Sequence, residues 1–247
     1  MDNNKTKMAI YGAGSLGTIL GAYITKSGKQ IDLINRNREH IEGLRQHGAQ
    51  IRGTVHFDVP VNALYPEEMN GTYDIIFLLT KQQDNDSVVR FLKPFLSEDG
   101  VLVSMQNGLP EPAIANIIGK ERTVGCAIAW GATLLGKGAS ELTSDPDSLS
   151  FSLGAFDPTE KLNLIKEVLN SMGTVVIEDN FMGARWSKLL INCAFSGLST
   201  VLGCTFGTAA ADTQPRRYLQ KLIKECIDVA AAANIRIEPV QGKNIAS

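Results

Sequence analysis

Gly12-Ala13-Gly14-Ser15-Leu16-Gly17 is a G-x-G-x-x-G run placed between a short apolar segment and a stretch with helical character. In such a run Gly12 allows a tight turn, Gly14 lets a pyrophosphate approach the backbone, and Gly17 allows close packing of helix on strand. The phosphates then face a helix N-terminus, where free N–H groups and the helix dipole favour negative charge. We therefore expect a dinucleotide at residues 12–17. The alternative is a glycine-rich turn that binds nothing.

The end of the second expected strand bears on which dinucleotide binds. A site for NAD usually carries an acidic residue there, about 20 residues after the glycines, which accepts a hydrogen bond from the ribose 2′-OH. This chain instead has Arg36 and Arg38, whose guanidinium groups can hold a 2′-phosphate. Asp32 is acidic but lies too early, inside the strand. The pattern favours NADP(H), unless both arginines are ordinary solvated charges.

Two further polar groups follow expected strands. Lys81 comes after an apolar strand that ends at Leu79, and Asn107 comes after one that ends at Met105. Open α/β sheets bind their ligands at the carboxyl ends of the strands, so both side chains could reach a cofactor or substrate. An Asn-Gly turn and a lysine that returns the chain to solvent would look the same without any function.

A stripe of polar residues marks the C-terminal part of the chain. Lys188, Asn192 and Ser196 recur every four residues, which places them on one side of an α-helix. A cation and a carboxamide one turn apart among apolar residues need partners or a solvent-filled cleft. A lysine whose ammonium extends into solvent from an exposed helix face is the simpler explanation.

The elements that must position these residues alternate between strand and helix over the first two-thirds of the chain. This alternation predicts an α/β fold with a doubly wound, Rossmann-type parallel sheet, followed by an all-helical C-terminal domain. Residues 49–61 are β-rich and partly alternating, which predicts a hairpin or edge strands. The expected strands are 8–11, 30–34, 74–80, 101–105, 123–129 and 174–177, and the expected helices are 16–27, 38–47, 85–92, 111–118 and 160–172.

Beyond residue 178 the pattern changes to two long helices, over 183–202 and 215–233. We therefore expect an NADP-binding domain over residues 1–179 and a helical substrate domain over residues 180–247. Two helices are few for an independent core. This part is expected to lean on the first domain, to pair with another chain as in a homodimer, or to be incomplete.

The composition excludes several classes of protein. Hydrophobic residues make up 44% of the 247 residues and the formal net charge is −2, so disorder and nucleic-acid binding are not indicated. Residues 1–7 are polar and the next apolar stretch is only strand-length, so we expect neither a signal peptide nor a membrane span. The scattered Cys126, Cys193, Cys204 and Cys226 predict reduced thiols, no metal and a cytoplasmic location.

Taken together, the motifs resemble those of the ketopantoate reductases (2-dehydropantoate 2-reductases), and the resemblance covers essentially the whole chain. The W-x-K-x-x-x-N-C helix at residues 186–193 is more specific than the glycine run. The resemblance implies NADPH-dependent reduction of 2-dehydropantoate to (R)-pantoate, a step towards pantothenate and coenzyme A. The matching segments are residues 12–17, Arg36, Thr80-Lys81, Gln106-Asn107-Gly108 and Trp186–Cys193.

The resemblance also implies roles for individual residues. Lys188 would be the general acid, which protonates the oxygen of the keto group as hydride reaches the adjacent carbon. Asn192 would bind the hydroxyl and carbonyl groups of the substrate. Lys81 and Asn107 would help to hold cofactor and keto acid.

The chain departs from the family pattern at three points. Ser196 stands where the family usually has a second asparagine, and Phe206 stands near the place of a further one. A serine and a glutamate that bind substrate in the family are expected beyond Ser247, so the sequence is either missing its C-terminus or that of a shortened relative. Reduction of another small 2-keto acid, and a non-catalytic NADP(H)-binding module, are therefore alternatives to ketopantoate reduction.

Overall fold

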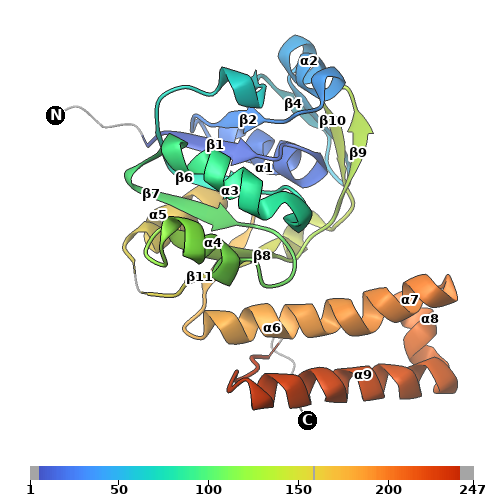
Figure 1. Ribbon diagram of the computed structural model, residues 1–247. Coiled ribbons are helices and arrows are strands. Elements are labelled where there is room, and N and C mark those ends of the chain that lie inside the picture. Colours follow the sequence, from blue (N-terminus) through green and yellow to red (C-terminus); the bar gives the residue numbers. More distant parts are fainter. Residues whose placement is uncertain (1–5, 158, 240–247) are drawn as a thin grey trace. The chain divides into compact units, whose positions relative to one another are not determined.

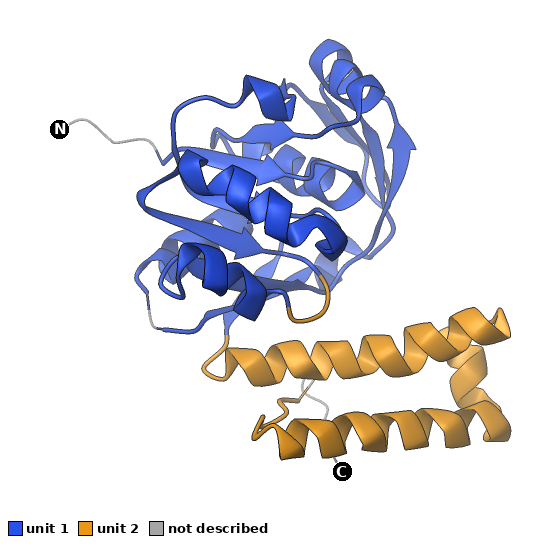
Figure 2. Cartoon of the chain, in the orientation of Figure 1, with its two compact units in different colours: residues 1–106, 110–177 blue, residues 107–109, 178–247 orange. Residues whose placement is uncertain are grey.

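The computed structural model describes residues 6–157 and 159–239, and the chain forms two compact units (Figure 1, Figure 2). The first unit contains residues 1–106 and 110–177, and the second contains residues 107–109 and 178–247. The division along the chain thus falls between Ile177 and Glu178. It also assigns the segment that contains Asn107 to the second unit.

The first unit is built on an eight-stranded sheet with the strand order β12-β11-β8-β7-β6-β1-β2-β5. The strands from β8 to β5 run parallel to one another. Their carboxyl ends therefore meet at one edge of the sheet. The bounds are β1 Met8–Tyr11, β2 Asp32–Ile34, β5 Asn62–Leu64, β6 Tyr73–Leu78, β7 Leu96–Ser104, β8 Thr123–Ile128, β11 Ser150–Ala155 and β12 Thr174–Ile177.

The sheet is mostly parallel, as expected, but its last two strands run in the opposite direction. β11 pairs antiparallel with β8, and β12 pairs parallel with β11, so both run against the other strands. A parallel return from β8 would need a crossover connection, usually a helix. The chain between β8 and β11 instead forms two strands of a second sheet.

Helices cover both faces of the main sheet (Figure 1). Along β6, Ile75 and Phe77 pack into the core that contains residues of α1 and α5, whereas Ile76 and Leu78 pack into the core beneath α3 and α4. This burial on both faces is why the strand is almost continuously apolar. The helices are α1 Ser15–Lys26, α2 Arg38–His47, α3 Asn85–Leu92, α4 Glu111–Ile118 and α5 Lys161–Leu169, with short 3₁₀ turns at Pro66–Glu68, Gln82–Asp84, Lys93–Phe95 and Pro146–Ser148.

A second, four-stranded sheet has the order β4-β3-β10-β9. The predicted hairpin over residues 49–61 is present as β3 (Ala49–Gly53) and β4 (Phe57–Val59). β9 (Ala132–Gly136) and β10 (Ala139–Leu142) were not expected from the sequence.

A buried histidine ties this second sheet to the helix after the glycine turn. The Gly138 N–H, in the β9–β10 turn, donates to His40 Nδ1 at 3.1 Å, and His40 Nε2 lies 2.9 Å from Thr18 Oγ1. Because Nδ1 accepts a hydrogen bond, the ring is neutral and its proton is on Nε2. Burial lowers the pKa of His40, which agrees with this arrangement.

The second unit is helical, but it is more broken than the sequence predicts. The expected helix over residues 183–202 consists of α6 (Phe181–Ile191), a π-helical turn (Asn192–Ser196) and α7 (Gly197–Leu202). A short helix, α8 (Phe206–Ala211), was not expected, and it is followed by α9 (Thr213–Ala232). The core among these helices is small, with Ala194, Ala209 and Leu219 as its buried members among the described residues.

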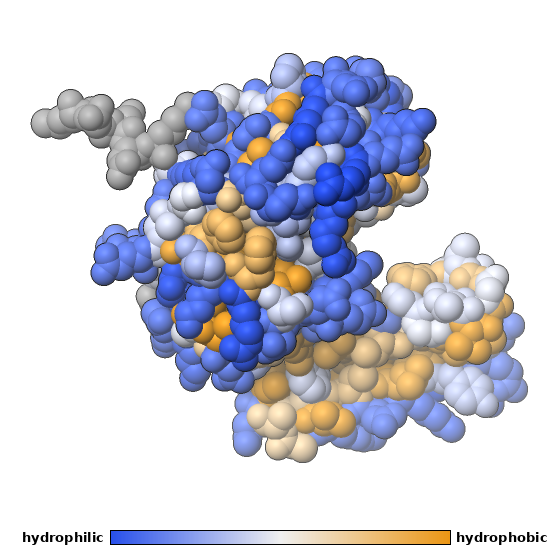
Figure 3. All heavy atoms as spheres, turned by 45° about the horizontal axis from the view of Figure 1, so that its top comes forward, coloured by the Kyte–Doolittle hydropathy of each residue, from blue (hydrophilic) through white to orange (hydrophobic). Residues whose placement is uncertain are grey.

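Apolar side chains also lie on the surface of this unit. Val201 is 83% exposed, and Leu202 and Phe206 are also exposed. In Figure 3 hydrophobic surface is visible along the helical unit, including its α7–α8 end. Among the helices in the described part of the chain, none combines the length and the apolar character that a membrane crossing would need.

Candidate functional site

The turn after β1 brings the backbone of three strand ends close together. Gly12 has φ +103°, and its N–H donates to the Ile34 carbonyl at the end of β2. A Cβ at Gly12 would stand 2.7 Å from the Thr80 nitrogen, just after β6. Only glycine fits this conformation and this spacing without strain.

Gly17 permits the first turn of α1 to pack on the same loop. A Cβ there would lie 2.7 Å from the Gly12 carbonyl oxygen and 2.9 Å from Ile10 Cγ2. The side chain of Ala13 is fully buried and its N–H donates to the Ile34 carbonyl, so Ala13 shapes the loop from within.

The N-terminus of α1 is open to an anion. Gly14 occupies the N-cap position and no side chain caps the helix there. A Cβ at Gly14 would meet no atom within 4 Å, so the space next to it is clear. The half-buried Ser15 and Leu16 form the first turn, whose N–H groups have no acceptor within a helix. These features suit a phosphate group.

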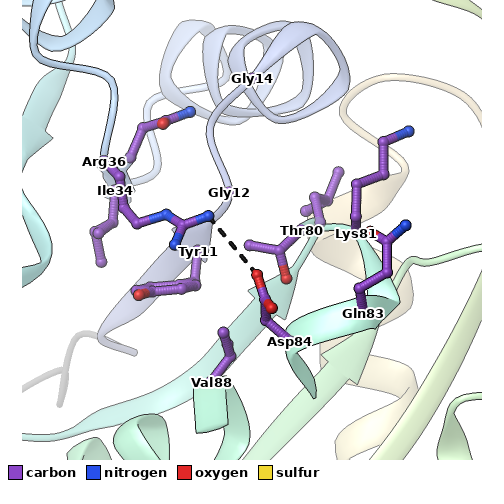
Figure 4. A pocket seen from close by; sticks show the side chains of 12 residues that line it. Tyr11, Gly12, Gly14, Ile34, Arg36, Thr80, Lys81, Gln83, Asp84 and Val88 are labelled. Atoms are coloured by element: carbon purple, nitrogen blue, oxygen red, sulfur yellow. Dashed lines mark ion pairs between the residues drawn. The ribbon is translucent and has the colours of Figure 1, made fainter. Parts of the chain in front are cut away.

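A cavity of about 340 Å³ lies beside this helix end, at the carboxyl ends of β1, β2 and β6 (Figure 4). Burial raises the pKa of Tyr11, which lines the cavity, and the nearby Arg36 guanidinium partly opposes that shift. The cavity therefore combines backbone donors, two cations and a neutral aromatic ring. Its lining residues are Tyr11, Gly12, Gly14, Ile34, Asn35, Arg36, Leu79, Thr80, Lys81, Gln83, Asp84 and Val88.

The structure separates the two arginines that follow β2. Arg36 lines the cavity, whereas Arg38 pairs with Glu67 at 2.8 Å and stacks over Tyr65. Asp32 does not line the cavity; it accepts hydrogen bonds from Asn62 Nδ2 at 2.7 Å and from the Tyr73 hydroxyl at 2.8 Å. Of the charged residues around β2 considered from the sequence, Arg36 is therefore the one placed at the cavity.

Lys81 lies at the cavity on a loop that a buried amide pair holds in place. Gln106 Nε2 donates to the Thr80 carbonyl at 2.8 Å and to Asn85 Oδ1 at 2.7 Å, and Asn85 Nδ2 donates back to Gln106 Oε1 at 2.9 Å. Both amides are buried. Sequence reasoning placed Gln106 in a motif but assigned it no role, and it missed Asn85. A buried amide at a strand end is the only signal, and burial is not visible in a single sequence.

The turn after β7 has the conformation that its Asn-Gly sequence suggests. Gly108 has φ +82°, and the Asn107 side chain is exposed. Asn107 does not line the cavity and belongs to the second unit. Thus Gly12, Gly14, Arg36 and Lys81 are brought together in the first unit, whereas Asn107 is grouped with the helical unit.

Lys188, Asn192 and Ser196 lie in the helical unit, and each is half-buried. The Asn192 N–H donates to the Lys188 carbonyl, so these two residues keep α-helical spacing. Ser196 follows across the π-helical turn, so the single α-helical stripe expected from the sequence is wrong from Asn192 onward. π-helical turns are rare and occur frequently at functional sites.

The start of α6 is anchored by the chain that follows α9. Asn180 caps α6 by accepting from the Gly183 N–H, and it donates to the Arg236 carbonyl at 2.7 Å and to Glu238 Oε1 at 2.6 Å. Hydrogen bonds from Asn180 and Arg236 hold the pKa of Glu238 below its usual range. Nearly two turns into the helix, the buried Ser187 hydroxyl contacts the Glu238 backbone. No cluster of candidate metal ligands is present among the described residues.

Comparison with known proteins gives two family-model matches. Residues 8–158 match the model described as "Ketopantoate reductase PanE/ApbA". Residues 180–246 match the model described as "Ketopantoate reductase PanE/ApbA C terminal". The two matches fall on the sheet-containing part and on the helical part, respectively.

Individual relatives are distant. The 2-dehydropantoate 2-reductase of Streptococcus pyogenes serotype M1 is 23% identical over 232 residues, which are 92% of this chain and 75% of the relative. The structure of 2-dehydropantoate 2-reductase from Geobacter metallireducens has a TM-score of 0.84 at 24% identity and covers 96% of this chain and 79% of its own. A D-mandelate dehydrogenase structure with NADH and anilino(oxo)acetate also has a TM-score of 0.84, at 22% identity, covering 94% and 76%.

Proposed function

Because this chain belongs to the ketopantoate reductase PanE/ApbA family of NAD(P)-dependent 2-keto acid reductases, we propose that it reduces 2-dehydropantoate to (R)-pantoate with NADPH. The observation that carries the cofactor part of the proposal is the cavity beside α1. There an uncapped helix N-terminus, a tight glycine turn with open space beside Gly14, Arg36 and Lys81 line or border one space.

The residues of the cavity fit the parts of NADPH. The N–H groups of the first turn of α1 would bind the pyrophosphate. Gly14 leaves the space beside them open, and Gly12 and Gly17 allow the turn to pack closely against β6 and β1. Arg36 would bind the 2′-phosphate through charge-assisted hydrogen bonds. Lys81 would contribute a further positive charge to the phosphates or to the keto acid.

We assign substrate binding and proton transfer mainly to residues of the helical unit. When bound, NADPH supplies the hydride that adds to the 2-keto carbon. The Lys188 ammonium would stabilise the negative charge that develops on the keto oxygen and then transfer a proton to it. Asn192, one helical turn away, would hydrogen-bond the substrate, and Ser196 and Asn107 would complete its binding. The occurrence of a π-helical turn that begins at Asn192 and ends at Ser196 supports a functional role for this stretch.

A second candidate is reduction of a different small 2-keto acid. Ser196 and Phe206 replace asparagines expected from the family pattern. Phe206 is exposed at the start of α8, with its ring 5.7 Å from that of Phe195. An apolar pair of this kind would favour a less polar substrate than 2-dehydropantoate. A non-catalytic NADP(H)-binding module is the remaining alternative, and pairing of two copies is a proposal that light scattering would test.

The experiment that tests the proposal is NADPH consumption with a panel of 2-keto acids, followed by absorbance. We expect 2-dehydropantoate to give the highest kcat/KM and NADPH to be preferred over NADH. Higher kcat/KM with another keto acid would move the assignment to the second candidate. Cofactor binding without turnover of any keto acid would favour the binding module.

A further inference from the structure

A single carboxylate faces the phosphate-binding side of the cavity. Asp84, at the end of the 3₁₀ turn after β6, is the only acidic residue among the described residues that line the cavity. Its Oδ2 lies 3.9 Å from Arg36 Nη2, and Figure 4 shows the two side chains facing each other. Asp84 follows the end of β6, and Arg36 follows the end of β2.

The contact between these two groups is loose. A separation of 3.9 Å is too long for a hydrogen bond, and the side chains of Arg36 and Asp84 are 79% and 60% exposed. An exposed pair of this kind contributes little to stability. The Arg36 guanidinium therefore keeps its donors available for a phosphate, while the Asp84 carboxylate stays next to any group that Arg36 binds.

The other candidate acid is already committed. Asp32 accepts hydrogen bonds from Asn62 and Tyr73 and does not line the cavity. A ribose 2′-hydroxyl beside Arg36 would thus find its carboxylate acceptor in Asp84, supplied by the loop after β6 instead of by the end of β2.

We infer that Asp84 sets the balance between the two nicotinamide cofactors, an inference that rests on the proposed function. The carboxylate accepts a hydrogen bond from the 2′-hydroxyl of NADH and repels the 2′-phosphate of NADPH. Arg36 acts in the opposite sense. The site therefore binds both cofactors, and its affinity for NADPH exceeds that for NADH by a smaller factor than Arg36 alone would produce.

The test uses two fragments that differ only in the 2′-phosphate, 2′,5′-ADP and 5′-AMP, with binding measured by calorimetry. In Asp84→Asn we expect 2′,5′-ADP to bind about fivefold to tenfold more tightly, because one exposed repulsion with a group of nearly two negative charges is removed. The affinity for 5′-AMP should fall about twofold to threefold, because a neutral amide is a weaker acceptor than a carboxylate.

Asp86→Asn is the matched control. Asp86 lies two positions away, loses the same charge on substitution, pairs with Arg90 at 2.9 Å and does not line the cavity. We expect it to leave the ratio of the two affinities unchanged within about twofold. High salt should narrow the difference between the wild type and Asp84→Asn, because screening weakens the same repulsion.

The outcomes distinguish this inference from the proposal on which it rests. If both fragments bind and the ratio of their affinities is the same in Asp84→Asn as in the wild type, the role of Asp84 is overturned and the cofactor site is not. The same holds if Asp86→Asn changes this ratio as much as Asp84→Asn does. Failure of the wild type to bind either fragment would overturn the cofactor site together with the inference.

Discussion

Replacing Gln106 with leucine should loosen the cavity wall by removing the centre of a buried hydrogen-bond network. The Gln106 amide joins the Thr80 carbonyl, Asn85 and the Ser104 hydroxyl, so its loss leaves each of them without that partner. Each buried polar group left unsatisfied costs about 1–3 kcal/mol, partly offset by relaxation and by the apolar side chain. We expect Gln106→Leu to lower the free energy of unfolding by about 2–4 kcal/mol.

The two tryptophans allow this change to be measured in the first unit alone. Trp130 lies in the first unit and Trp186 in the second, so urea unfolding of a Trp186→Phe background reports on the first unit through Trp130 fluorescence. The exposed Gln46→Leu serves as control and should change stability by less than about 0.5 kcal/mol.

A double-mutant cycle with Asn85 tests whether the amide pair acts as a unit. Asn85→Leu combined with Gln106→Leu should be about 1–2 kcal/mol less damaging than the sum of the single changes, because neither variant then strands the other amide. The affinity for 2′,5′-ADP should also fall about tenfold in Gln106→Leu, a loss of about 1.4 kcal/mol, as Thr80 and Lys81 lose their support. Strict additivity, or a destabilisation below about 1 kcal/mol, would refute the reasoning.

Three other substitutions address separate parts of the molecule. Lys188→Met should reduce kcat about 10²–10⁴-fold while NADPH binding persists. The control Lys221→Met, at an exposed position of α9, should leave kcat unchanged. Near-normal turnover in Lys188→Met would remove Lys188 from the mechanism. Gly17→Ala should weaken nucleotide binding, because the added Cβ would stand 2.7 Å from the Gly12 carbonyl oxygen and distort the turn. An unchanged nucleotide affinity in calorimetry would contradict this role of Gly17. Folding lowers the pKa of His40 from its ordinary value of 6.5, so unfolded chains take up a proton first and the free energy of unfolding should fall as the pH drops below about 6.5. In His40→Gln, urea unfolding should show a shallower dependence of this free energy on pH. The same pH dependence in both proteins would contradict the assignment.

Local sequence signals predicted much of the first unit. α2, α3 and α4 have the bounds expected from the sequence, and β1 and the glycine turn stand where the motif placed them. These segments carry their own start and stop signals, such as Asn37, whose side chain caps α2, and Gly48 with φ +73° at its end. Such signals act over a few residues and need no tertiary context.

The elements that were missed depend on distant partners. β9 is exposed over most of its length and does not show the pattern of a buried strand. β7 was expected over residues 101–105, but its earlier part, which contains the exposed polar residues Glu98 and Asp99, was missed. β11 was not expected either, and its direction is set by its pairing with β8, which its own residues do not reveal. Within the site, the pairing of Gln106 with Asn85 depends on burial, and the approach of Asp84 to Arg36 depends on contacts across the sheet edge.

The π-helical turn bears on whether Lys188 is functional or merely an exposed charge. A lysine that only extends into solvent is compatible with an undistorted α-helix, and the spacing of Lys188, Asn192 and Ser196 in the sequence predicts such a helix. The structure keeps α-helical spacing between Lys188 and Asn192 and then widens the helix up to Ser196. A wider turn gives Ser196 a direction different from the one that α-helical spacing implies. Because such turns are rare and occur frequently at functional sites, the turn supports the proposed binding role for Asn192 and Ser196 over the explanation of Lys188 as a solvated charge.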